Sequence, residues 1–120
     1  MLNWFKKKNS DANDGDGPDF ASVDSMSKAI KLFKKGQLSK LHLMPLEFGG
    51  EDSDMNTLYT PDIVVELKAR FDSMIEQMLI DGKNLSYSAK PAYKDKSVIP
   101  SALEISVTGD AEFSETINIW

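Results

Sequence analysis

The sequence contains no cysteine, which excludes disulfide bonds, thiolate zinc sites and cysteine nucleophiles. Its single histidine, His42, excludes metal sites built from several imidazoles and any mechanism that needs two of them. No apolar run approaches the roughly 20 residues of a bilayer-spanning helix, so no transmembrane segment is expected. The 120 residues, 41% of them hydrophobic, are enough for one modest core. We therefore expect a cytoplasmic protein with one folded domain.

Positive charge is scarce in the part of the chain that is expected to fold. Residues 1–35 carry seven lysines and five aspartates, whereas residues 36–120 carry seven basic and fourteen acidic residues, a net charge of −7. Nucleic acids gain affinity from clustered Lys and Arg side chains. The domain is therefore a poor nucleic-acid binder unless a metal ion lies between protein and phosphate. Its charge favours another protein, a basic one, as the partner.

Residues 1–20 are predicted to be a flexible N-terminal segment, and residues 21–120 a single α+β domain. The polar stretch before Phe20 is rich in Asp, Asn and Gly, and it buries too little apolar surface to offset the entropy of ordering. Near its start, Trp4 and Phe5 precede three lysines, a pattern that permits weak contact with a membrane surface. The charges follow the apolar residues, the reverse of a secretory signal.

A short helix is predicted after Ser22 from apolar residues at three- and four-residue spacing. Met26 and Phe33 lie on its apolar face, Ser22 or Asp24 is expected to cap it, and Gly36 is expected to stop it.

A long amphipathic helix is predicted between Pro61 and Gly82, with Thr60 as its cap. Its opposite face carries charged residues, among them Lys68 and Asp72, which we expect to lie in solvent. Its apolar face consists of Val64, Leu67, Phe71, Met74, Ile75 and Met78.

Four segments have the composition of strands. One short strand is expected over residues 38–45, followed by a long loop over 48–59. After Gly82, apolar and polar residues alternate in three further segments, and Gly109 predicts a tight hairpin between the last two. The predicted fold class is α+β, with a short N-terminal helix, one strand, and a long helix packed on a three- to four-stranded antiparallel meander.

The segment around His42 contains the residue types that chemistry requires. His42 lies at a strand end, a double glycine follows, and an acidic stretch ends at Asn56. An imidazole can act as a general base, and an amide oxygen can ligate a hard metal ion. The structural alternatives are a His42 bonded to a nearby carbonyl or carboxylate such as Glu47, and an Asn56 that satisfies the backbone of its own loop.

This pattern resembles a known family. His42, then Phe48-Gly49-Gly50, then Asn56 follow the order and nearly the spacing found in the DNA/RNA non-specific endonucleases, which include nuclease domains of bacterial polymorphic toxins. The resemblance covers roughly residues 38–120 and extends to Gly82-Lys83, Pro91-Ala92-Tyr93 and Pro100. It implies that His42 is a general base and that Asn56 ligates magnesium.

The three residues before His42 depart from the family pattern, in which Asp, Arg and Gly stand there. This chain has Ser39, Lys40 and Leu41 instead. The glycine that permits close backbone approach and the guanidinium that holds phosphate are therefore missing. Metal-assisted hydrolysis needs the base, the metal ligand and the phosphate clamp together. The resemblance thus points to a retained scaffold rather than a retained activity.

The first functional hypothesis is a small non-catalytic bacterial protein-binding module without a cofactor. On this hypothesis the chain is an immunity or accessory factor of a toxin system on a nuclease-like scaffold. Glu51, Asp52 and Asp54 are the predicted partner-binding residues, and the alternative is that they form only a solvated loop.

The second hypothesis is a magnesium-dependent non-specific DNA/RNA endonuclease. Here His42 is the general base, Lys40 stands in for the missing guanidinium, and Asn56 ligates the magnesium ion.

Overall fold

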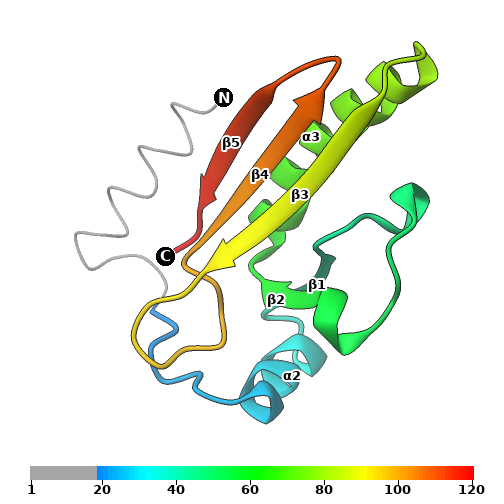
Figure 1. Ribbon diagram of the computed structural model, residues 1–120. Coiled ribbons are helices and arrows are strands. Elements are labelled where there is room, and N and C mark those ends of the chain that lie inside the picture. The colour runs from blue at the N-terminus through cyan, green and yellow to red at the C-terminus, as the bar shows by residue number, and fades with distance from the viewer. Residues whose placement is uncertain (1–18) are drawn as a thin grey trace.

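The computed structural model describes residues 19–120, drawn as the coloured ribbon in Figure 1. The predictions for residues 1–18, including the membrane contact through Trp4 and Phe5, lie outside the described residues. In chain order, the elements are α2 (Met26–Lys34), β1 (Ser39–His42), the 3-10 turns η2 (Leu46–Phe48) and η3 (Asp54–Asn56), β2 (Thr57–Thr60), α3 (Asp62–Ile80), β3 (Leu85–Ala92), β4 (Ala102–Gly109) and β5 (Phe113–Asn118).

The short helix α2 lies where the apolar spacing predicts it, but its cap differs. The Oγ of Ser25 accepts a hydrogen bond from the backbone N–H of Lys28 at 3.3 Å, so Ser25 is the N-cap instead of Ser22 or Asp24. Asp24 pairs with the Lys28 ammonium at 2.8 Å. Beyond the helix, Gly36 adopts a φ of 78°, a conformation that favours glycine and ends a helix.

The long helix α3 lies across one face of a three-stranded sheet (Figure 1). The strands pair antiparallel in the order β3-β4-β5. The register places Ala89 opposite Ile105 and Leu103 opposite Ile117, so the apolar residues gather on the face that α3 covers. The α+β class is therefore confirmed, and the meander has three strands. The core between the layers includes Val64, Leu67, Leu103, Ile105, Ile117 and Ile119.

The predicted single strand is one half of a separate hairpin. β1 pairs antiparallel with β2, with Leu41 opposite Leu58. The loop predicted over 48–59 is therefore wrong at its end, because β2 begins at Thr57. Leu58 and Thr60 are buried alternately along this four-residue strand, so pairing and burial stabilise it despite its length.

A second apolar cluster joins α2, the hairpin and the C-terminal residues. Trp120 donates a hydrogen bond from its indole Nε1 to the carbonyl of Ile99 at 3.0 Å, and its ring packs against that of Phe20 in a T-shaped arrangement with 5.9 Å between centroids. This cluster anchors the hairpin end of the molecule. Its buried members are Val23, Ala29, Leu38 and Ile99.

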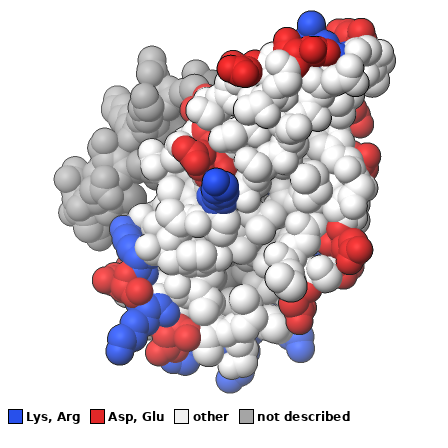
Figure 2. Space-filling view, viewed as in Figure 1, with Lys and Arg blue, Asp and Glu red and all other residues white. Residues whose placement is uncertain are grey.

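The outer face of the three-stranded sheet is mostly uncharged, as Figure 2 shows. The exposed residues of this outer face include Ser86, Ser88, Thr108, Ser114 and Thr116.

Among residues 19–120, neither helix combines the length and the apolar composition needed to cross a membrane.

Candidate functional site

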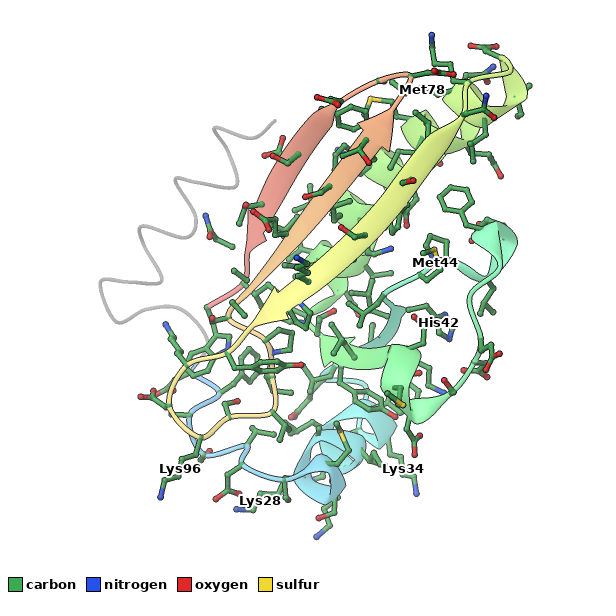
Figure 3. The ribbon with its side chains drawn as sticks, in the orientation of Figure 1. Lys28, Lys34, His42, Met44, Met78 and Lys96 are labelled. Carbon is green, nitrogen blue, oxygen red and sulfur yellow. The ribbon has the colours of Figure 1, made fainter. Side chains whose placement is uncertain are left out.

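His42 is the last residue of β1, and Figure 3 shows its imidazole beside the loop that connects β1 to β2. We call residues 43–56 the β1–β2 loop. The Nε2 atom of His42 lies 3.0 Å from Oδ1 of Asp52, and the histidine side chain is 24% exposed. The carboxylate that holds His42 is therefore that of Asp52 and not that of Glu47.

Asp52 links the histidine to the surface of the loop. The hydrogen bond with His42 lowers the pKa of the Asp52 carboxyl below its usual value, and the positive charge of Lys40 lowers it further. The Asp52 side chain remains 64% exposed. The hairpin thus brings together Lys40, His42 and Asp52, three of the residues that the sequence singles out.

Asn56 closes the β1–β2 loop. Its Oδ1 accepts a hydrogen bond from the backbone N–H of Met44 at 2.8 Å. Its Nδ2 donates to the carbonyls of Met44 at 2.9 Å and Glu51 at 2.8 Å. The carboxamide oxygen that the nuclease hypothesis assigns to magnesium is therefore directed at the backbone of its own loop.

Gly49 and Gly50 allow the backbone of the same loop to close. Gly49 ends the η2 turn with a φ of 101°, a conformation that side chains rarely adopt. A Cβ atom on Gly50 would lie 2.1 Å from the carbonyl oxygen of Met44 and 3.0 Å from Nδ2 of Asn56. The sequence spacing that is similar to that of the endonucleases therefore corresponds, in this chain, to a loop that one asparagine amide and two glycines close.

The predicted partner-binding residues lie on the outer side of this closed loop. Glu51, Asp52 and Asp54 are all exposed. The next residue, Met55, is 93% exposed, which is unusual for a large apolar side chain. Residues 51–55 of the loop therefore present three carboxylates and one large apolar side chain to solvent.

A cleft of about 560 Å³ separates the hairpin from α3. Its volume lies within the roughly 300–1,000 Å³ of small-molecule sites. Lys40 and His42 line this cleft and Asn56 does not, so the base and the metal ligand of the nuclease hypothesis do not share it. The hairpin and loop contribute Lys40, Leu41, His42, Pro45, Leu46 and Glu47, and α3 contributes Val65, Lys68, Ala69, Asp72, Ser73 and Glu76.

The α3 wall of the cleft contains a buried polar triad that sequence reasoning missed. Lys68 is 2% exposed, so its assignment to a solvated helix face is wrong. Its Nζ donates to Oδ2 of Asp72 at 2.7 Å, and the hydroxyl of Tyr87 on β3 donates to Oδ1 of Asp72 at 2.8 Å. The signal was available, because Lys68 lies four residues after Val64 and seven before Ile75, within the apolar stripe.

Magnesium requires several oxygen ligands at short distance in near-octahedral geometry. The oxygen of Asn56 accepts a backbone hydrogen bond, and Asp52 binds His42. Within residues 19–120, no group of three or more His, Asp or Glu side chains is arranged to hold a metal ion. The described residues around Asn56 do not fit the magnesium site that the resemblance implies.

The chain matches no protein-family model, no curated protein and no solved structure. The similarity to the endonucleases therefore rests on the residues quoted above.

The buried triad makes the free energy of unfolding change with pH in the alkaline range. Burial raises the pKa of the Tyr87 hydroxyl far above its usual value, and the charge of Asp72 raises it further. An unfolded tyrosine ionises near pH 10. Above about pH 10 the folded state holds a proton that the unfolded state has lost, so the Tyr87 contribution to stability decreases as the pH rises. Burial lowers the pKa of Lys68, which acts in the opposite sense up to its unfolded value of 10.5.

We therefore expect the free energy of unfolding to fall less steeply above pH 10 in Tyr87→Phe than in the wild type. Urea unfolding measured in steps between pH 8 and pH 11.5 checks this. Parallel curves for the two proteins would show that Tyr87 is not the group responsible.

Proposed function

We propose that this protein is a non-catalytic protein-binding module that engages a basic partner through Glu51, Asp52 and Asp54. The observation that carries the proposal is the ordered loop on which these acids stand. Asn56 closes the loop with three hydrogen bonds, and the three carboxylates lie on its exposed side. A surface that is already ordered loses little conformational entropy on association, so more of the contact energy remains as affinity.

Charge and apolar exposure both support a protein as the partner. Complementary charges accelerate encounter and align the two surfaces. Protein interfaces also bury apolar anchors inside a polar rim. Met55, at 93% exposure and directly after Asp54, supplies such an anchor beside the acids. Figure 2 shows acidic side chains along the right edge of the molecule, and both lysines and acidic side chains toward the end that holds α2.

The resemblance of residues 38–120 to toxin-type nuclease domains supports a role as an immunity or accessory factor of a bacterial toxin system. The absence of the Asp-Arg-Gly residues before His42 and the engagement of Asn56 with Met44 support the non-catalytic assignment.

The test compares two triple variants of the full chain as immobilised bait. In the loop variant, Glu51→Gln, Asp52→Asn and Asp54→Asn remove three charges from the proposed surface. In the control, Glu66→Gln, Glu104→Gln and Glu112→Gln remove three exposed charges elsewhere. We expect the wild type and the control to capture the same basic protein at low salt, and the loop variant to bind it about tenfold more weakly.

Capture should also weaken with salt, since exposed charges are screened beyond roughly 10 Å at 0.1 M. Absence of a partner at every salt concentration, or equal binding by both variants, would contradict the proposal.

The nuclease alternative retains one supporting observation. Asp52 holds the His42 imidazole at 3.0 Å, and a carboxylate that orients an imidazole is typical of general bases. Plasmid and RNA incubated with the purified protein and magnesium decide between the two functions. We expect no cleavage. Cleavage that His42→Ala abolishes would establish the nuclease and refute the binding module.

A further inference from the structure

The cleft between the hairpin and α3 has a charge balance that identifies its ligand. Three basic side chains line it, and each already faces a partner. The Nζ of Lys68 is bound to Asp72 at 2.7 Å, and Nε2 of His42 lies 3.0 Å from Asp52. The ammonium of Lys40 lies 5.8 Å from the centre of the Phe33 ring on α2.

The carboxylates of the cleft are less fully compensated. Asp72 is neutralised by Lys68 and accepts a second hydrogen bond from Tyr87. Glu47 on the η2 turn and Glu76 on α3 are both exposed, and neither takes part in an ion pair within residues 19–120. The two walls therefore each present a carboxylate outside any ion pair of the described residues. The charge of Lys68 acts on Glu47, but the three carboxylates of the lining outnumber its two lysines, which makes the cleft attractive to a cation.

The shape and lining of the cleft fit a long side chain. Along α3 the lining runs from Val65 to Glu76, about 16 Å at 1.5 Å per residue. Its apolar lining suits the methylene stem of an arginine or lysine, whose charged end would reach the carboxylates. The apolar residues are Leu41, Pro45, Leu46, Val65 and Ala69.

The η2 wall is held in place independently of any ligand. The ring of Phe48 packs edge-on against Tyr87 with 5.7 Å between centroids. Tyr87 in turn is fixed by its hydrogen bond to Asp72. The buried triad thus contacts the η2 turn through Phe48, and Glu47 of this turn stands on the same loop as the proposed partner-binding acids.

We infer that this cleft receives an arginine or lysine side chain on an extended segment of the basic partner, between Glu47 and Glu76. The inference rests on the proposed function, because it extends the surface at Glu51, Asp52 and Asp54 into the adjoining cleft.

A blocked pentapeptide, Leu-Ala-Arg-Ala-Leu, added to the full chain labelled with nitrogen-15, tests the assignment. We expect the amide chemical shifts of Leu46, Ala69 and Ser73 to change when the arginine peptide is added. We expect no change when the arginine of the peptide is replaced by its uncharged analogue citrulline or by glutamate. The double variant Glu47→Gln/Glu76→Gln should bind the arginine peptide about fivefold more weakly than the wild type. The matched control Glu66→Gln/Glu104→Gln should bind it within about twofold of the wild type, since these exposed acids lie outside the cleft.

The outcomes separate this inference from the proposed function. Shifts confined to residues 51–55 would overturn the cleft assignment and leave the loop surface standing. No shifts at all, equal shifts with citrulline, or binding of the glutamate peptide in the cleft would likewise overturn it. The capture experiment with the loop variant decides the proposed function separately, because that variant keeps Glu47 and Glu76 unchanged.

Discussion

Replacement of Lys68 by methionine is expected to lower the free energy of unfolding by about 3 kcal/mol, the range found when a buried ion pair loses one partner. Methionine keeps most of the volume and removes the charge. Asp72, whose side chain is 16% exposed, then loses its cationic partner and keeps the Tyr87 hydroxyl as a hydrogen-bond donor in a poorly hydrated site. The cost comes from this uncompensated carboxylate, since the pair itself contributes little beyond its own desolvation.

The chain contains a matched control for this experiment. Lys28 pairs with Asp24 at the same four-residue separation and at 2.8 Å, but the two side chains are 56% and 49% exposed. Lys28→Met should therefore cost far less stability than Lys68→Met. Urea unfolding of both variants measures the contrast. Similar losses would mean that burial does not govern the Lys68 pair.

A second substitution distinguishes an unpaired charge from lost packing. In Lys68→Met/Asp72→Leu both charges are gone, and the site becomes apolar except for the Tyr87 hydroxyl. We expect this double variant to be more stable than Lys68→Met by at least about 1 kcal/mol. If it is less stable than the single variant, then the packing of the Lys68 stem, and not the charge of Asp72, would explain the loss.

The parts of the fold that local periodicity specifies were predictable from the sequence. α3 and strands β3 to β5 have sustained apolar periods, and a tight turn separates β4 from β5. The four residues of β2 are too few to show a period, and they follow an acidic stretch. Their pairing with β1 depends on closure of the β1–β2 loop, which single-residue propensity does not register.

In the candidate site, too, some contacts were foreseeable from the sequence and others depend on the fold. The two glycines and the asparagine are close in sequence, so their meeting in one loop was foreseeable. The bond between His42 and Asp52 spans ten residues of that loop, and its exact partner depends on how the loop folds. The triad of Lys68, Asp72 and Tyr87 joins α3 to β3, and only the packing of the helix on the sheet brings it together.

Substitution of Gly50 by alanine is expected to lower the free energy of unfolding by about 2–3 kcal/mol, the upper part of the usual range for point mutants. The new Cβ would lie 2.1 Å from the carbonyl oxygen of Met44, and this obstacle is backbone that no rotamer change can move. Gly36→Ala is the control, because a Cβ there meets no atom within 4 Å and only the left-handed φ of 78° is strained. It should cost about 1 kcal/mol.

Urea unfolding of the two glycine variants gives the comparison, and equal losses would contradict the close approach at Gly50. The same variant links loop closure to binding. Displacement of Met44 breaks the hydrogen bonds of Asn56, so the loop loses order while all its acids remain. If preorganisation contributes to affinity, Gly50→Ala should weaken capture of the basic partner at a temperature where the variant is still folded. Undiminished capture would show that charge alone, without a closed loop, suffices for binding.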